Sequence, residues 1–286
     1  MEQRKCHLCS SEDIRLIHKG TRDNSHIDVL KCANCELVFL SSFDHIREGY
    51  YEESGMHVDK ELDIVKWRKS TYEDDIRRKE FLKNIINKKD VLDFGCGNGG
   101  FIEYAQPLVN SICGIELEEA ARKYLLSDGK TIWADIEYCD KKFDVITLFH
   151  VLEHLEHPIE YLMKLGNLLK PESESQIIIE IPNADDALLT LYHSTNFADF
   201  TYWSPHLFLY NPSNIETLVE NSGFRVNWIK QVQRYPLANH LYWLSKGMPG
   251  GHAIWNFLND NQLHEQYERI LSERGMCDTI LVSLSK

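Results

Sequence analysis

The feature that most constrains the fold of this chain is a glycine-rich turn directly after a short apolar segment. Residues 91–94 read Val-Leu-Asp-Phe, and Gly95, Gly97 and Gly99 follow at alternate positions. Glycine lets a backbone bend sharply and pass close to a ligand, because no Cβ atom stands in the way. An ordinary loop can carry such glycines too. A buried strand that enters a helix through such a turn is nevertheless typical of nucleotide-binding folds.

An acidic residue further along the chain favours the binding site over the ordinary loop. Glu116 stands 19 residues after Gly97 and follows a second apolar segment, residues 111–115. A carboxylate at about this distance from a glycine turn is the pattern that binds both hydroxyls of a ribose. The glycine spacing differs from the GxGxxG of dinucleotide sites, and the acid at Asp93 would repel a pyrophosphate but suits a cation.

Asp93 to Gly99 closely resemble motif I of the class I S-adenosylmethionine-dependent methyltransferases. The resemblance continues in order through Glu116 and residues 134–136, 143–149, 150–155 and 178–183, and covers about residues 78–286. It implies methyl transfer from S-adenosylmethionine. It also implies an α/β, Rossmann-like fold whose seven-stranded, mostly parallel sheet has helices on both faces.

The alternation of strands and helices downstream of the turn agrees with this fold class, because it predicts a parallel sheet covered on both faces. In such sheets ligands bind beyond the carboxyl ends of the strands. We expect strands over 90–94, 111–116, 130–134, 143–149, 175–181, 224–230 and 279–284, and helices over 99–107, 117–127, 157–169 and 212–221.

Charge and position suggest separate roles for the residues at that edge of the sheet. Glu116 is expected to bind the ribose hydroxyls, and Asp135 with the amide of Ile136 to meet the adenine edge. Asp93 is expected to act on the amino group of the methionine moiety, or to order the loop. The residues expected to bind the cofactor are Asp93, Gly95, Gly97, Asn98, Glu116, Leu117, Asp135, Ile136, Phe149 and His150.

A histidine is the natural base for the proton that a methyl acceptor loses. His206 lies in a segment, residues 204–208, that resembles the part of related sugar methyltransferases carrying a catalytic histidine. We expect His206 to be the base, with His150 as the second catalytic candidate, although a histidine that only packs the loop is an open alternative. The resemblance implies that Glu153 and His154 mainly stabilise the turn after the fourth strand.

Four of the eight cysteines form two CxxC pairs, Cys6 with Cys9 and Cys32 with Cys35, separated by 22 residues. Two such pairs are typical of a tetrahedral four-cysteine zinc site. A module of about 50 residues has little core of its own, so a metal would stabilise it. We expect these cysteines to hold a structural Zn2+; two disulfides or a redox-active CxxC are the alternatives.

These features divide the chain into a zinc-ribbon module over residues 1–50, a helical connector over 51–89 and a methyltransferase domain over 90–286. Aromatic-rich insertions interrupt the domain at 183–211 and 231–278. The first suits a lid over a substrate pocket. The second suits substrate recognition or the surface of a homodimer. Tyr50, Tyr51 and Trp67, in and before the connector, are candidates to close over the cofactor.

Composition narrows the classes of function. The net charge of −13 disfavours nucleic acid and anionic membranes as partners, and no apolar stretch approaches the ~20 residues of a membrane helix. Without an apolar leader, we expect a cytoplasmic enzyme. We expect methyl transfer to a small molecule, a nucleotide-linked sugar or a precursor in capsule or O-antigen polysaccharide biosynthesis. The alternatives are an RNA methyltransferase with a zinc module and a non-catalytic cofactor-binding scaffold.

Overall fold

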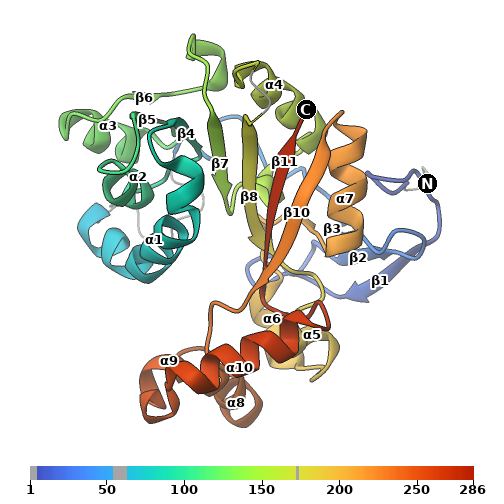
Figure 1. Cartoon of the computed structure of the whole chain (residues 1–286). Helices are drawn as coiled ribbons and strands as arrows, with labels where there is room; N and C mark the ends of the chain where they lie inside the picture. The colour runs from blue at the N-terminus through green and yellow to red at the C-terminus, as the bar shows by residue number, and fades with distance from the viewer. Residues whose placement is uncertain (1–4, 54–62, 172–173) are drawn as a thin grey trace.

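A seven-stranded sheet forms the centre of the molecule (Figure 1). The computed structural model describes residues 5–53, 63–171 and 174–286. β11 pairs antiparallel with both of its neighbours, and the other neighbouring strands of this sheet are parallel. The expected mostly parallel α/β sheet is therefore confirmed. From edge to edge, its strands are β10 (Arg225–Val232), β11 (Thr279–Ser285), β8 (Gln176–Pro182), β7 (Val145–Phe149), β4 (Asp90–Phe94), β5 (Ser111–Ile115) and β6 (Ile132–Trp133).

The central strands are buried on both faces, as their continuous apolar sequences predict. Leu92 of β4, Ile146 of β7 and Ile179 of β8 have no exposed surface. Helices α1 to α3 lie on one side of the sheet, and α4 and α7 on the other (Figure 1). These helices are α1 (Ile64–Ile86), α2 (Gly100–Ala105), α3 (Glu119–Ser127), α4 (Pro158–Leu168) and α7 (Pro212–Asn221).

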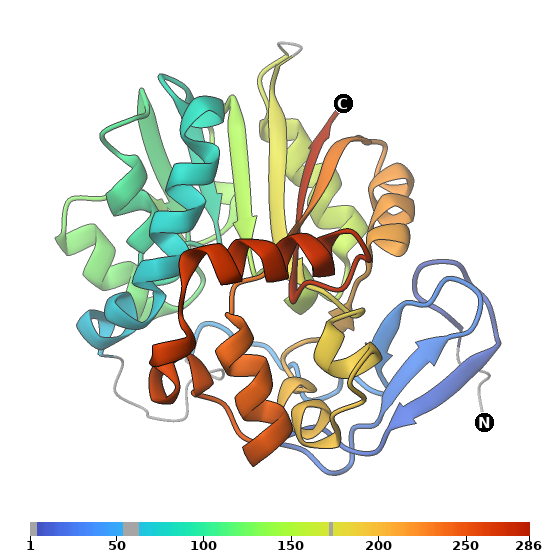
Figure 2. The ribbon, with the colours of Figure 1, turned by 60° about the horizontal axis from the view of Figure 1, so that its bottom comes forward.

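Short helices gather beyond the carboxyl ends of β7, β8 and β10 (Figures 1 and 2). They come from the two insertions that the sequence predicts at 183–211 and 231–278. Of the helices in the described part of the chain, none combines the length and apolar character that crossing a membrane requires. The insertion helices are α5 (Ala187–Thr190), α6 (Thr195–Thr201), α8 (Leu237–Lys246), α9 (Gly251–Ile254), η3 (Asn256–Leu258) and α10 (Asn261–Ser272); η1 (Ile136–Tyr138) and η2 (Leu152–His154) follow β6 and β7.

A second sheet contains the N-terminal strands β1 (Ile14–His18), β2 (Val29–Cys32) and β3 (Val38–Leu40). Its fourth strand, β9 (Phe208–Leu209), comes from the first insertion and pairs antiparallel with β3. Phe208 and Tyr210 are each only 1% exposed. This part of the expected lid therefore joins the N-terminal module to the large domain.

Candidate active site

The glycine turn after β4 has the backbone geometry that its sequence predicts. Gly95 and Gly97 have φ values of 72° and 52°, in the left-handed region that favours glycine. A Cβ atom on Gly95 would lie 2.5 Å from Cγ2 of Val151. The amides of Gly95 and Cys96 both donate to the carbonyl of Ile115, at 2.8 and 3.0 Å, so the turn is held against β5.

A cavity of about 330 Å³ lies at this turn, beyond the carboxyl ends of β4, β5 and β7. Nearly all residues expected to bind the cofactor line it. The side chain of Ile136 does not line it, because that side chain is only 7% exposed and belongs to the core; the role expected of the Ile136 amide stays a prediction. The expected residues that line the cavity are Asp93, Gly95, Gly97, Asn98, Glu116, Leu117, Asp135, Phe149 and His150.

Glu116 is anchored by two backbone amides at the end of β5. Its Oε2 accepts a hydrogen bond from the amide of Gly97 at 2.6 Å, and its Oε1 accepts one from the amide of Glu118 at 2.8 Å. Burial raises the pKa of Glu116, and these two hydrogen bonds oppose the rise. A carboxylate accepts about four hydrogen bonds, so two acceptor positions remain for a ligand such as a ribose.

Asp93 is the second acidic group of the cavity and is only 3% exposed. The hydroxyl of Thr147 on β7 donates to its Oδ1 at 2.8 Å. Burial raises the pKa of Asp93 to about 7, although the Thr147 hydrogen bond opposes the shift. A cation placed beside Asp93 would favour the ionised carboxylate.

Asn98 and Asp135 also shape the cavity through local hydrogen bonds. Asn98 accepts from the amide of Gly100 at 2.8 Å and donates to the hydroxyl of Thr71 at 3.0 Å. Asp135 accepts from the amide of Glu137 at 2.9 Å and so begins η1. Asn98 therefore ties the glycine turn to α1, and Asp135 stands at the start of η1 on the cavity wall.

A buried charge network that was not predicted from the sequence lies behind the cavity. Glu180 on β8 has no exposed surface. Arg77 contacts both of its carboxylate oxygens, at 3.0 and 2.9 Å, and Arg78 donates to Oε1 at 2.9 and 2.8 Å. Burial alone would raise the pKa of Glu180, but the charges of Arg78 and Arg77 and the hydrogen bond with His150 hold it well below its ordinary range. The sequence signal that could have revealed this network is an acidic residue, Glu180, within the mainly apolar strand 176–182.

His150 stands at the entrance to this network with a strained backbone, at φ 56°. Its Nε2 lies 3.1 Å from Nη1 of Arg234, and its Nδ1 lies 3.2 Å from Oε1 of Glu153. Nε2 also lies 3.4 Å from Oε1 of Glu180. Arg234 only donates and the Glu180 carboxylate only accepts, so these two neighbours of Nε2 favour opposite protonation states of that nitrogen. Burial and Arg234 lower the pKa of His150, but its hydrogen bonds with Glu153 and Glu180 outweigh them, and the pKa is raised.

A larger cavity of about 810 Å³ adjoins the first one. It lies among the insertion helices, so both insertions reach the same site. Trp67, His150, His154 and Arg234 line both cavities. Aromatic and polar side chains alternate on the rest of the wall. They include Phe197, Phe200, Trp203, Trp243, Asp186, His206, Asn239, His240, His252 and Asp278.

Of these two cavities, His206 lines the larger one and not the smaller. Burial, together with the neighbouring His154, lowers the pKa of His206 to about 3. Its ring packs on those of His154 and Trp203, with ring centroids 5.0 and 5.4 Å away. The imidazole is therefore neutral near pH 7, but it is a weaker base than an ordinary histidine. Its assignment as the catalytic base stays a prediction, as does that of His150.

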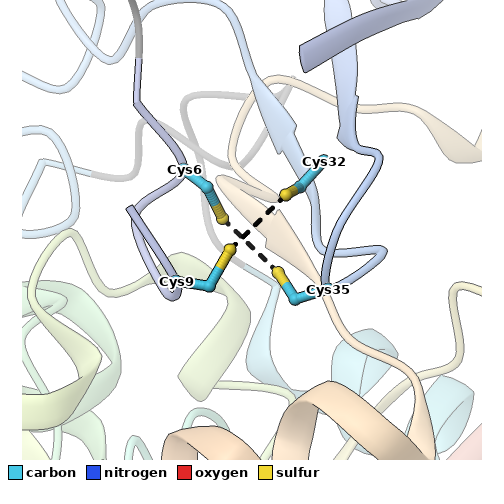
Figure 3. Close-up of side chains that lie close together, drawn as sticks. All are labelled: Cys6, Cys9, Cys32 and Cys35. Atoms are coloured by element: carbon cyan, nitrogen blue, oxygen red, sulfur yellow. Dashed lines mark hydrogen bonds between the residues drawn. The ribbon is translucent and has the colours of Figure 1, made fainter. Parts of the chain in front are cut away.

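The four cysteines of the two CxxC pairs come together in the N-terminal module (Figure 3). The Sγ atoms of Cys6 and Cys35 are 3.5 Å apart and those of Cys9 and Cys32 are 3.6 Å apart, and all four lie within 4.8 Å of one another. All are free thiols. Four sulfurs around one zinc ion, with Zn–S bonds of about 2.3 Å, are about 3.8 Å apart. The donor set and its spacing therefore fit a tetrahedral metal site.

Comparison with known proteins identifies the family. Residues 64–227, more than half of the chain, match the family model of a methyltransferase domain. The chain belongs to this methyltransferase family. Two solved structures share the fold of this methyltransferase: a SAM-dependent methyltransferase from Archaeoglobus fulgidus (TM-score 0.51, 21% identity, covering 77% of this chain and 94% of that one) and the plantazolicin methyltransferase BamL (TM-score 0.51, 16% identity, covering 82% and 92%). The expected class I S-adenosylmethionine-dependent methyltransferase domain is thereby confirmed.

Curated relatives match parts of this methyltransferase. A ubiquinone biosynthesis O-methyltransferase from Nitrosococcus oceani is 28% identical over 183 residues, which cover 56% of this chain and 74% of the relative. N-methyltransferase 4 from Papaver somniferum is 29% identical over 146 residues, which cover 46% of this chain. The methyltransferase spans only 38% of the length of that second relative.

Proposed function

We propose that this protein transfers a methyl group from S-adenosylmethionine to a small-molecule acceptor. The observation that carries the proposal is the pair of adjoining cavities that share Trp67, His150, His154 and Arg234. The smaller cavity has the glycine turn and the acids that suit the cofactor. The larger one has room for a separate acceptor, since its volume of about 810 Å³ lies within the usual range of ligand sites.

The residues of the smaller cavity divide the task of holding the cofactor. Bound S-adenosylmethionine supplies an activated methyl group on a cationic sulfonium. The two free acceptor positions of Glu116 would take the ribose hydroxyls, and Asp93 would favour the cationic methionine end. Trp67 and Tyr51 line the same cavity and would cover it from the connector side. The protein's main contribution is then to hold the acceptor in line with the methyl group.

For the acceptor we propose a nucleotide-linked sugar or a related precursor of a cell-surface glycan. The wall of the larger cavity combines flat aromatic faces, such as Trp203 and Trp243, with hydrogen-bonding groups, such as Asn239 and His240. Apolar faces with a few polar groups are what a hydroxyl-rich ring needs for burial and orientation. The resemblance of residues 204–208 to sugar methyltransferases supports the same choice.

A phenol-like aromatic acceptor is the second candidate. It is favoured by the aromatic side chains Phe197, Phe200, Trp203 and Trp243 on one cavity wall, where a flat ring could stack. The match to ubiquinone biosynthesis O-methyltransferases points to the same class of acceptor. A phenol and a sugar hydroxyl differ strongly in acidity, so turnover distinguishes the two.

We further propose that the four-cysteine cluster binds one structural zinc ion. Four thiolates leave no open position for a substrate, so the ion would stabilise the module over residues 1–50. The amide of Leu40 on β3 donates to the carbonyl of Leu207 at 3.1 Å, and the amide of Leu207 donates to the carbonyl of Glu153 at 2.8 Å. A stable module would therefore hold the segment that carries His206 beside the turn after β7.

The test is release of S-adenosylhomocysteine with three sets of acceptors: nucleotide-linked sugars with their free phosphates, small phenols and catechols, and bulk RNA. Turnover with a nucleotide-linked sugar supports the proposal, and turnover with phenols alone moves the acceptor to the second candidate. Release with RNA alone refutes a small-molecule acceptor. Cofactor binding without release from any set indicates a scaffold and refutes the activity.

A further inference from the structure

Glu153, His154 and His206 form a cluster at the boundary of the two cavities. Each offers one ligand atom, and these three atoms lie within 4.8 Å of one another. His154 lines both cavities, whereas His206 lines the larger one. The cluster therefore stands between the cofactor side and the acceptor side of the proposed site. It lies apart from the four cysteines and contains no thiol.

Two polar atoms in the cluster are buried without any hydrogen-bond partner. These are Oε2 of Glu153 and Nδ1 of His206. Glu153 has no exposed surface, and its other oxygen already faces His150 at 3.2 Å. A buried carboxylate oxygen or imidazole nitrogen without a partner is unfavourable, because it has lost its hydrogen bonds to water and gained none in return. Two such atoms within one cluster are consistent with a binding partner that both can share.

The third member is oriented for the same partner. Nδ1 of His154 lies 2.8 Å from the carbonyl of Pro205, and a carbonyl only accepts, so Nδ1 carries the proton. Nε2 of His154 is then the nitrogen with a free lone pair. Metal-binding histidines are commonly oriented by such a hydrogen bond from the other ring nitrogen to a carbonyl.

The backbone holds the cluster in place. The amide of Leu207 donates to the carbonyl of Glu153 at 2.8 Å, and the hydroxyl of Tyr51 donates to the carbonyl of His154 at 3.0 Å. The ring of His206 packs edge-on against that of His154, with centroids 5.0 Å apart. Bonds of about 2.0–2.1 Å to one tetrahedral ion place ligand atoms about 3.3 Å apart, so a bound ion would draw these three atoms closer than the 4.8 Å within which they lie.

We propose that Glu153, His154 and His206 bind one divalent transition-metal ion, such as Zn2+, with an open coordination position toward the larger cavity. Two imidazoles and one carboxylate are a common ligand set for such ions and leave room for water or a substrate oxygen. Binding an acceptor oxygen there rests on the proposed function, whereas binding of the ion itself does not.

Cobalt(II) separates this site from the cysteines, because thiolate ligands give intense near-ultraviolet charge-transfer bands and a histidine–carboxylate site does not. Full-length protein without an affinity tag is titrated with Co2+ while the metal of the cysteine site is left in place. We expect one further equivalent of Co2+ with weak visible bands, displaced by Zn2+. Wild-type protein that binds no Co2+ of this spectral type overturns the proposal.

Three variants locate the ion. Glu153→Gln keeps an oxygen for His150 but removes the charge, and His206→Asn removes an imidazole. Each should weaken Co2+ binding by more than the ~10–100-fold that loss of an outer hydrogen-bond partner causes. His157→Gln, an exposed histidine in the same segment, should bind like wild type. Thermal melts verify folding. If folded Glu153→Gln and His206→Asn bind Co2+ as tightly as the control His157→Gln, the assignment is overturned. Co2+ binding without any methyl transfer would support the metal site and refute only the proposed activity.

Discussion

Glu116 is the residue at which the proposed cofactor binding can be tested most sharply. Its two carboxylate oxygens each accept one backbone amide, from Gly97 and from Glu118, and two acceptor positions remain. If a ribose occupies these positions, Glu116→Ala removes two hydrogen bonds to a charged group. We therefore expect Glu116→Ala to weaken binding of S-adenosylhomocysteine, which has the same ribose as the methyl donor.

The expected size of the effect follows from the contacts. A hydrogen bond to a charged group contributes about 1.5–3 kcal/mol, so loss of both corresponds to about 3–6 kcal/mol. Since 1.4 kcal/mol is tenfold in affinity, the dissociation constant should rise by about 10²–10⁴-fold. Glu116→Gln keeps the shape and a single acceptor oxygen, so it should fall between wild type and Glu116→Ala.

Isothermal titration calorimetry measures the affinity, and Glu119→Ala is the matched control. Glu119 lies three residues further on, is exposed, and pairs with Lys123. An analogue of S-adenosylhomocysteine that lacks one ribose hydroxyl adds a second arm. Wild type should bind this analogue about 10–100-fold more weakly than S-adenosylhomocysteine itself. Glu116→Ala should bind the two ligands with nearly the same affinity. Unchanged affinity in folded Glu116→Ala, or an equal penalty for the analogue in both proteins, would refute the assignment.

The remaining predictions concern pH, the cysteines and the base. Burial raises the pKa of Asp93 to about 7. Because a cationic ligand prefers the ionised carboxylate, the affinity for S-adenosylmethionine should rise with pH up to about 7 and then level off. A calorimetric pH series that is equally steep for Asp93→Asn would contradict this. Cys35→Ser should remove one equivalent of zinc in metal analysis and lower the melting temperature by at least ~5 °C, at about 2–4 °C per kcal/mol; unchanged zinc content would rule out the cysteine site. His206→Asn should reduce turnover by ~10²–10⁴-fold. Its affinity for S-adenosylhomocysteine, measured by calorimetry, should be unchanged, because His206 lines the acceptor cavity and not the cofactor cavity. Near-normal turnover would show that His206 has no role in the reaction.

The sequence predicted those parts of the fold whose signals are local. β4, the glycine turn and Glu116 lie within 27 residues of one another (90–116), and each is marked by its own residue types. Apolar runs likewise marked β7, β8 and β11, because strands buried on both faces need apolar residues at every position. The part of the smaller cavity's wall that follows β4, β5 and β7 was predictable for the same reason, whereas Asp74, Arg78 and Arg234 on that wall were not.

Residues whose roles depend on distant partners were not predictable. Arg77 and Arg78 lie on a charged helix whose own sequence does not indicate their partner, because Glu180 lies about 100 residues away on β8. β9 is only two residues long, and nothing in its own sequence indicates that it pairs with β3. The aromatic character of Phe208 and Tyr210 predicted burial but did not say against which part of the molecule.

The position of β9 gives the N-terminal module a role beyond its own stability. The chain of contacts runs from β3 through Leu207 to the carbonyl of Glu153, and from Pro205 to the ring of His154. Both contacts end on the acceptor side of the site, whereas Glu116 and Asp93 are held by β4, β5 and β7 of the large sheet. The two halves of the site thus have separate supports. Disturbance of the module should therefore displace His206 and His154 while the strands that hold Glu116 and Asp93 stay in place.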